Sequence, residues 1–304
     1  MGPRGTRAPP GPSIAPYVLA EALSRGVGLE TVWDGTSPQR FGDRVVTNSG
    51  DGQGVRCPHC DLLRATTLAA NPVYYALTAK VGAANATRRA ALAGIRTLAG
   101  RPIQQFVTSG MLTNGFGTGD FAVSPLDQAT GYATFAAGGV RHDPYFVDRV
   151  EKLTGGRGVY THRHSVGRRA FSPWVAEQAT FAMEATLWQR TGTPFDRSLA
   201  DWRPAAAMLG TAQGPAGAKG AGSTNTAAWT CGFTPQLAAA VWVGPDRKSL
   251  VDKAGRQVYA IGLPALTWKA FMDGALRGQP QLPLAGESPK SVRAGPQPPT
   301  ASVR

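Results

Sequence analysis

Two cysteines stand three positions apart in Cys57-Pro58-His59-Cys60. A C-x-x-C pair carries out thiol–disulfide chemistry where it opens a helix after a strand, and it supplies half of many zinc sites. Here the pair follows a glycine-rich stretch, and Cys231 is the only other cysteine, so four thiolate ligands are not available. The spacing favours a loop pair, with or without a local disulfide, over a redox or metal centre.

Two histidines, His162 and His164, would point to one face of an extended segment. A metal ion needs further ligands, and the neighbouring Arg163, Arg168 and Arg169 repel a cation. We therefore predict no metal site, and no cofactor motif is present.

Two further segments lack the frames that phosphate binding or nucleophilic catalysis requires. The run Gly115–Gly119 is rich in glycine but is not followed by the G-K-S/T of a phosphate-binding loop. Ser109 has no G-x-S-x-G frame, so we do not interpret it as a nucleophile.

The composition indicates a basic globular protein. Its 304 residues, 42% of them apolar, are enough for one or two domains with a buried core. Its net charge of +13 suits a polyanionic neighbour such as an acidic wall polymer. No nucleic-acid-binding motif accompanies this charge, so nucleic acid is not an expected partner. No apolar run approaches the ~20 residues of a transmembrane helix, and no signal core follows the basic start, so the sequence leaves the localisation unknown.

Apolar periodicity predicts the elements that must position any site. Helices are expected over 15–25, 61–80, 86–98, 125–137, 172–190 and 265–276, and residues 29–60 form a loop or hairpin region. The apolar runs 228–233 and 237–243 predict a β-hairpin of an antiparallel sheet. Helices, then paired strands, then a closing helix indicate a mixed α/β or α+β domain over 10–280. We expect a disordered lead over 1–9 and a disordered, proline-rich tail over 281–304.

Several stretches resemble, in order, the transpeptidase domain of class A (bifunctional) penicillin-binding proteins. The stretches are PGPSIAPYVL (Pro10–Leu19), NPVYYALTAKVG (Asn71–Gly82), VSPLDQATGYATFA (Val123–Ala136), the hairpin Trp229–Gly244 and the closing helix from Pro264 to Met272. The resemblance implies the penicillin-binding-protein/serine β-lactamase-like fold, an antiparallel sheet flanked by helices. Because the chain begins shortly before the first motif, we expect the first strands of that sheet to be missing, along with the glycosyltransferase domain and membrane anchor that the family carries upstream.

Three motifs supply the chemistry of that family, and all three are altered here. In S-x-x-K, Pro12 replaces the serine nucleophile and Ala15 replaces the lysine base. A shift by one residue does not restore the motif, because Ser13 would then need lysine where Pro16 stands.

The second and third motifs fall on Ala69-Ala70-Asn71 and Ala218-Lys219-Gly220 in ungapped counts. In S-x-N, Ala69 replaces the relay serine, while Asn71 remains to orient a substrate amide or to serve as a turn residue before Pro72. In K-T-G, Lys219 stands one residue late, either as a substrate-binding group or as a solvated loop lysine.

The resemblance implies a family of serine D,D-transpeptidases that is acylated by D-Ala-D-Ala stem peptides or by β-lactams on the extracytoplasmic, membrane-anchored side. With nucleophile, base and relay replaced, we predict a pseudoenzyme that binds a peptidoglycan stem peptide, a β-lactam or a cell-wall protein partner without covalent chemistry. One alternative is an active transpeptidase or carboxypeptidase with a displaced nucleophile, Ser13 first. A second is a non-functional fragment of a bifunctional penicillin-binding protein.

Overall fold

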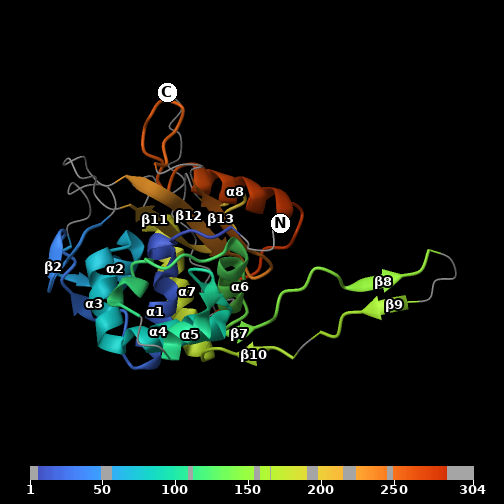
Figure 1. Ribbon diagram of the computed structural model, residues 1–304. Helices are drawn as coiled ribbons and strands as arrows, with labels where there is room; N and C mark the ends of the chain where they lie inside the picture. Colours follow the sequence, from blue (N-terminus) through green and yellow to red (C-terminus); the bar gives the residue numbers. More distant parts are fainter. Residues whose placement is uncertain are drawn as a thin grey trace.

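The computed structural model describes residues 6–48, 57–108, 112–153, 158–164, 166–189, 198–214, 224–244 and 249–285. Figure 1 shows a helical body beside an antiparallel sheet, with one hairpin that projects well away from the body. This arrangement confirms the predicted α+β class. Among the described residues, no helix is long and apolar enough to cross a membrane.

The main sheet has three antiparallel strands in the order β11–β12–β13. They are β11 (Ala206–Gln213), β12 (Asn225–Phe233) and β13 (Ala238–Val243). The last two form the predicted hairpin, in which Trp229 pairs with Trp242 and their rings stack. The sequence prediction missed β11, although it pairs with β12 along nearly its whole length.

Helices cover both faces of this sheet (Figure 1). On one face lies α8 (Leu263–Ala275), whose Trp268 packs so closely on β12 that a Cβ at Gly232 would lie 2.7 Å from the indole ring. The opposite face carries the 3₁₀ turn η1 (Gly11–Ile14), α6 (Pro125–Ala136) and α7 (Pro173–Gln189). The core therefore runs through both faces of β12, which explains its almost continuous burial.

The remaining helices form the body on the η1 side of the sheet. They are α1 (Ala15–Ser24), α2 (Leu62–Leu68), α3 (Asn71–Val81), α4 (Ala83–Ala93), α5 (Ile103–Thr108) and the 3₁₀ turn η2 (Asn114–Phe116). The helix predicted over 61–80 is two helices, because Ala69 adopts the left-handed conformation (φ 52°) and ends α2. The helix predicted over 86–98 begins and ends earlier, at glycines with positive φ, Gly82 and Gly94.

Short strand pairs connect these helices. They are β1 (Val32–Trp33) with β4 (Cys60–Asp61), β2 (Gln39–Phe41) with β3 (Arg44–Val46), β5 (Thr97–Leu98) with β6 (Arg101–Pro102), β7 (Val140–Arg141) with β10 (Arg168–Arg169), and β8 (Arg149–Glu151) with β9 (Gly158–Thr161). The pairs over residues 32–61 confirm the predicted loop and hairpin region.

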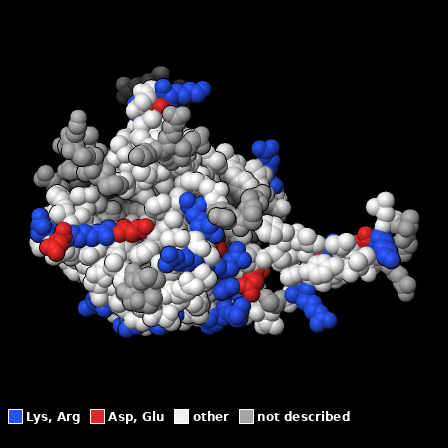
Figure 2. All heavy atoms as spheres, viewed as in Figure 1, with Lys and Arg blue, Asp and Glu red and all other residues white. Residues whose placement is uncertain are grey.

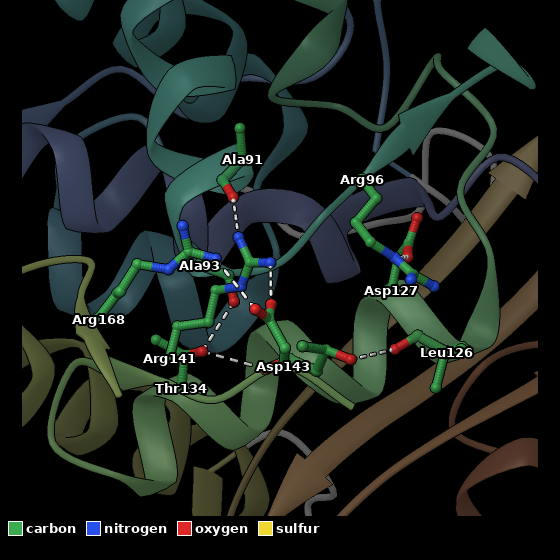
Figure 3. A network of polar contacts seen from close by, with 10 residues as sticks. Ala91, Ala93, Arg96, Leu126, Asp127, Thr134, Arg141, Asp143 and Arg168 are labelled. Atoms are coloured by element: carbon green, nitrogen blue, oxygen red, sulfur yellow. Dashed lines mark hydrogen bonds and ion pairs between the residues drawn. The ribbon is translucent and has the colours of Figure 1, made fainter. Parts of the chain in front are cut away.

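The hairpin β8–β9 projects into solvent, and a charged network fixes its base (Figure 3). Arg141 donates to the carbonyl of Ala91 at the end of α4 and pairs with Asp143, while Arg168 donates to the other oxygen of Asp143 at 3.0 Å. Arg141 and then Arg168 hold the pKa of Asp143 below its usual range, so this carboxylate stays charged. The network joins both ends of the projecting segment to the body.

Both predicted domain boundaries need adjustment. Ala8 exchanges two backbone hydrogen bonds with Val123, and the Trp229 indole donates to the carbonyl of Pro9, so the end of the predicted lead belongs to the fold. Beyond α8, Leu284 is 3% exposed and packs in the core, so the folded part extends past residue 280. Residues 1–5 and 286–304 lie outside the described ranges.

Candidate functional site

The first motif lies at the start of α1, where the chain passes from η1 into the helix. Pro12 occupies the first turn, in which a missing N–H costs nothing, and Ala15 begins α1 one turn later. Both residues are buried, Ala15 completely. The helix that would carry a nucleophile and base is therefore retained, while neither side chain can donate, accept or transfer a proton.

Ser13 is the neighbouring hydroxyl, and its contacts are structural. It is fully buried, and its Oγ donates to the carbonyl of Pro10 at 2.8 Å. Two side chains of α6 complete its hydrogen bonds: Gln128 Nε2 donates to Ser13 Oγ at 3.0 Å, and the Tyr132 hydroxyl donates to its carbonyl at 2.7 Å. Ser13 therefore ties η1 to α6 and presents no accessible oxygen to a substrate.

Among the described side chains that interact with Ser13 and its neighbours, none is a base that could activate it. Burial raises the pKa of the Tyr17 and Tyr132 hydroxyls well above the usual value. Burial also raises the pKa of the Cys231 thiol, despite a hydrogen bond with Ser13 that lowers it. All three groups stay neutral near pH 7. The cluster is therefore a set of buried polar groups that form hydrogen bonds with one another.

The second motif lies at the junction of α2 and α3. Ala69, which the sequence comparison assigns to the relay position, is 5% exposed, and its methyl group cannot relay a proton. Asn71 begins α3; its backbone N–H donates to Asn48 Oδ1, and its Nδ2 donates to the carbonyl of Thr47, both at 2.8 Å. Its own Oδ1 is buried and has no hydrogen-bond partner among the described residues. Asn71 thus has a structural role through its two donors and keeps one unused acceptor.

The strand beside η1 is β11, the strand that the sequence prediction missed. A Cβ at Gly210 would lie 2.1 Å from the Pro10 carbonyl oxygen and 2.7 Å from the Ser13 nitrogen, and a Cβ at Gly11 would lie 2.8 Å from the Thr211 carbonyl. The backbones of η1 and β11 are therefore in direct contact, and β11 contains no lysine. Ala218, Lys219 and Gly220, onto which the ungapped count placed K-T-G, lie outside the described residues.

A glycine-rich loop closes the other side of η1. Gly119 has φ +81°, and a Cβ there would lie 2.3 Å from the Gly11 carbonyl oxygen. This is the end of the segment Gly115–Gly119, which contributes to η2 and to the turns that follow it. Only glycine allows this approach, so η1 is held between the loop and β11. This close packing explains why Pro12 is buried.

The remaining candidates from the sequence do not join this site. Cys57 and Cys60 form a disulfide, and Cys231 is a buried free thiol. His162 and His164 lie on the projecting segment near Tyr145, which stacks on the half-buried His162, while His164 is exposed. Within the described ranges, no group of three or more His, Cys, Asp or Glu side chains could hold a metal ion.

The positive charge is also spread out. Figure 2 shows Lys and Arg side chains in separate groups over the visible face, several of them next to acidic residues. Ion pairs also neutralise single basic residues, as where Arg44 lies 2.6 Å from Asp120. The described surface in this view presents no continuous basic groove for nucleic acid.

Comparison with known proteins decides the family. The family described as penicillin binding protein transpeptidase domain matches residues 6–246, most of the chain. The chain belongs to this family. Penicillin-binding protein 1A of Mycolicibacterium smegmatis is 34% identical over 89% of the chain, and that of Mycobacterium tuberculosis is 31% identical over 88%. The chain spans about a third of the length of these curated relatives (34% and 32%).

A solved structure supports the same fold. The PonA1 protein of Mycobacterium tuberculosis, determined in complex with penicillin V, superposes with a TM-score of 0.80 at 31% identity, covering 92% of this chain and 72% of that one. Penicillin-binding protein A of the same organism, determined as an imipenem acyl-enzyme complex, gives a TM-score of 0.64 at 25% identity, covering 89% of this chain and 60% of that one. The resemblance inferred from the motifs is thereby confirmed for family and fold.

Proposed function

We propose that this transpeptidase-family domain does not carry out acyl transfer and acts in cell-wall synthesis by non-covalent binding. The observation that carries the proposal is the identity and burial of two residues. Pro12 and Ala15 occupy the nucleophile and base positions of a retained helix, and neither has a reactive atom. Loss of the nucleophile alone costs roughly 10⁶ in turnover in a comparable serine enzyme.

The packing around η1 supports the proposal independently of residue type. A nucleophile must approach the substrate carbonyl to about 3–3.5 Å. Here Gly119 lies against Gly11, Gly210 lies against Pro10 and Ser13, and Pro12 of the same turn is buried. The side chain at position 12 is therefore not open to a substrate.

Ser13 is a poor substitute for the missing nucleophile. Its oxygen already donates to Pro10 and accepts from Gln128, and the nearest hydroxyls and thiol are held in their neutral forms. An active enzyme with Ser13 as nucleophile would have to break these bonds and expose a fully buried side chain.

The ligand class follows from the family. PonA1 was solved with penicillin V, and a β-lactam or a peptidoglycan stem peptide is the corresponding non-covalent ligand here. Asn71 is the first proposed binding residue, because its Oδ1 has no partner among the described residues; this oxygen is buried, so a ligand amide N–H reaches it only after the side chain is uncovered. Lys219 is a second proposed binding residue, and a cell-wall protein is the alternative partner.

Labelling with a fluorescent penicillin tests the loss of chemistry. We expect no label that survives boiling in detergent, while the transpeptidase domain of PonA1, as the positive control, is labelled. A stable label that disappears in Ser13→Ala would overturn the proposal and establish the displaced-nucleophile enzyme.

Non-covalent binding needs a separate measurement. Penicillin V should raise the melting temperature of the chain in a concentration-dependent manner, and Asn71→Ala should reduce that shift. If penicillin V and a stem peptide both leave the melting curve and the amide chemical shifts unchanged, the binding role is wrong, whatever the labelling result.

A further inference from the structure

A small hollow lies on the outer side of α7, next to the chain segment that follows α8. Its volume is about 150 Å³, and its lining includes Glu177, Thr180, Phe181 and Glu184 of α7 together with Leu284. The four α7 residues follow the spacing i, i+3, i+4 and i+7, which places them along one helix face. The opposite face of α7 is buried in the core through residues such as Ala179 and Met183. The hollow is therefore separate from η1 and from the proposed function.

The charge of this helix differs from that of the whole chain. The protein carries 32 Lys and Arg against 19 Asp and Glu, yet α7 contains two glutamates and no basic residue. Both glutamates line the hollow. Two carboxylates at one small hollow favour a cation there, and α7 itself has no basic side chain that competes for them.

A buried hydroxyl in the lining lacks a partner. Thr180 is 1% exposed, and its Oγ1 makes no hydrogen bond among the described residues. A threonine within a helix can instead donate to the carbonyl four residues earlier, as Thr186 of the same helix does to Ala182 at 3.1 Å. A donor group bound in the hollow would supply the partner that Thr180 lacks.

The rest of the lining suits an aliphatic chain. The ring of Phe181 is half exposed, at 51%, and Leu284 is an apolar contact on the other side. Since one water occupies about 30 Å³ of liquid, the hollow accepts the end of a single side chain rather than a peptide. An aromatic ring also attracts a cation that lies over its face.

We propose that this hollow binds a primary alkylammonium group, the terminal group of lysine and of other diamino acids. An ammonium has three N–H donors, and the acceptor side chains of the lining include Glu177, Glu184 and Thr180. Carboxylates accept more than one hydrogen bond each, so a contact that either glutamate makes elsewhere does not prevent this one. The alkyl stem then lies against Phe181 and Leu284.

Titration with n-butylammonium chloride, followed by amide chemical shifts of the full chain, tests this site. We expect saturable shifts confined to residues near 177–184 and 284, with weak, millimolar affinity that falls as NaCl is raised. The neutral isostere 1-butanol should give no saturable shift at the same amides. Equal responses to the two probes, or no saturable shift, would overturn the proposal.

Variants separate a binding role from a structural one. Glu177→Gln should weaken butylammonium binding at least fivefold, and Thr180→Val, which keeps the shape and removes the acceptor, should weaken it about threefold without lowering the melting temperature. Glu151→Gln on β8 is the matched control and should leave the affinity unchanged. Unchanged affinity in Glu177→Gln, or tighter binding of butylguanidinium than of butylammonium, would contradict the assignment.

Discussion

Gly210 of β11 and Ser13 of η1 lie in direct backbone contact. A Cβ at Gly210 would come within 2.7 Å of the Ser13 nitrogen and 2.1 Å of the Pro10 carbonyl oxygen, closer than real side chains approach backbone atoms. Ser13 in turn is fixed to α6 by Gln128. The turn that carries the degenerate S-x-x-K motif is therefore wedged between a strand and a helix, and its conformation depends on a glycine about 200 residues away.

Gly210→Ala should destabilise the protein because it forces η1 away from β11. Overpacking of a close backbone contact costs about 1–3 kcal/mol. Gly274→Ala is the matched control, since a Cβ at this exposed position of α8 meets nothing within 4 Å and should raise stability by about 0.5–1 kcal/mol. Urea unfolding monitored by tryptophan fluorescence measures both; equal effects of the two substitutions would contradict the contact.

The helices could be predicted from the sequence, and β11 could not. The segments 15–24, 125–136 and 263–275 show regular apolar spacing, and their predicted bounds agree with the structure to within two residues. In contrast, β11 is an alanine-rich run without regular alternation, whose status as a strand depends on pairing with β12. Pairing between distant segments leaves little local pattern in the sequence. The ungapped count therefore placed K-T-G on residues 218–220, beyond the end of the strand that lies against η1.

The residue types of the candidate site are a prediction from the sequence, and its packing was not visible there. The sequence assigns Pro12, Ala15 and Ala69 to the positions of reactive residues, and this assignment stays a prediction. The burial of Ser13 was not visible, because its partners Gln128 and Tyr132 are 115 and 119 residues away. The sequence signal for these contacts was the V-S-P stretch at the start of α6. Its resemblance to the family predicted the helix but not the contacts that the helix makes.

Ala15→Lys, which restores the base of the first motif, should strongly destabilise the protein. Ala15 is 0% exposed, and burial of an unpaired ammonium costs several kcal/mol, on the order of 3–5. Burial lowers the folded-state pKa of such a lysine below its unfolded value, so the unfolded state binds more protons and stability rises with pH. We therefore expect the variant to be more stable at pH 9.5 than at pH 7 relative to the unsubstituted protein, measured by urea unfolding.

Ser24→Lys controls for the introduction of a lysine into α1. Ser24 is the exposed last residue of the same helix, where a positive charge is favourable. This variant should differ from the unsubstituted protein by less than about 1 kcal/mol at both pH values. If Ala15→Lys behaves like Ser24→Lys, the helix start is open to solvent and the closed site described above is incorrect.

The two arginines that flank Glu21 should contribute unequally to stability. Glu21 Oε2 pairs with Arg89 at 2.8 Å and its Oε1 with Arg25 at 2.6 Å, but the Arg89 side chain is 19% exposed and that of Arg25 is 48% exposed. Arg89 also donates to the carbonyl of Ala170, which links α4 to the segment before α7. Arg89→Met should cost about 2–3 kcal/mol and Arg25→Met less than about 1 kcal/mol in thermal unfolding. Equal losses of unfolding free energy would show that solvent screens both ion pairs to the same extent.

Asp201→Asn should weaken the protein at neutral pH more than at pH 3. Asp201 accepts hydrogen bonds from the backbone N–H and the guanidinium of Arg203, which is buried and also donates to the carbonyls of Leu276 and Gln279. Arg203 lowers the pKa of Asp201, so the stabilisation is present above the unfolded carboxyl pKa of about 3.9 and is lost as pH falls through the folded value. Since the Asp201 side chain is 44% exposed, solvent screening limits the expected loss to about 1–2 kcal/mol at pH 7. Asp43→Asn, at the exposed turn between β2 and β3, is the control and should have little effect at either pH. Chemical unfolding at both pH values measures the difference, and a loss for Asp201→Asn that is as large at pH 3 as at pH 7 would contradict a charge-dependent role.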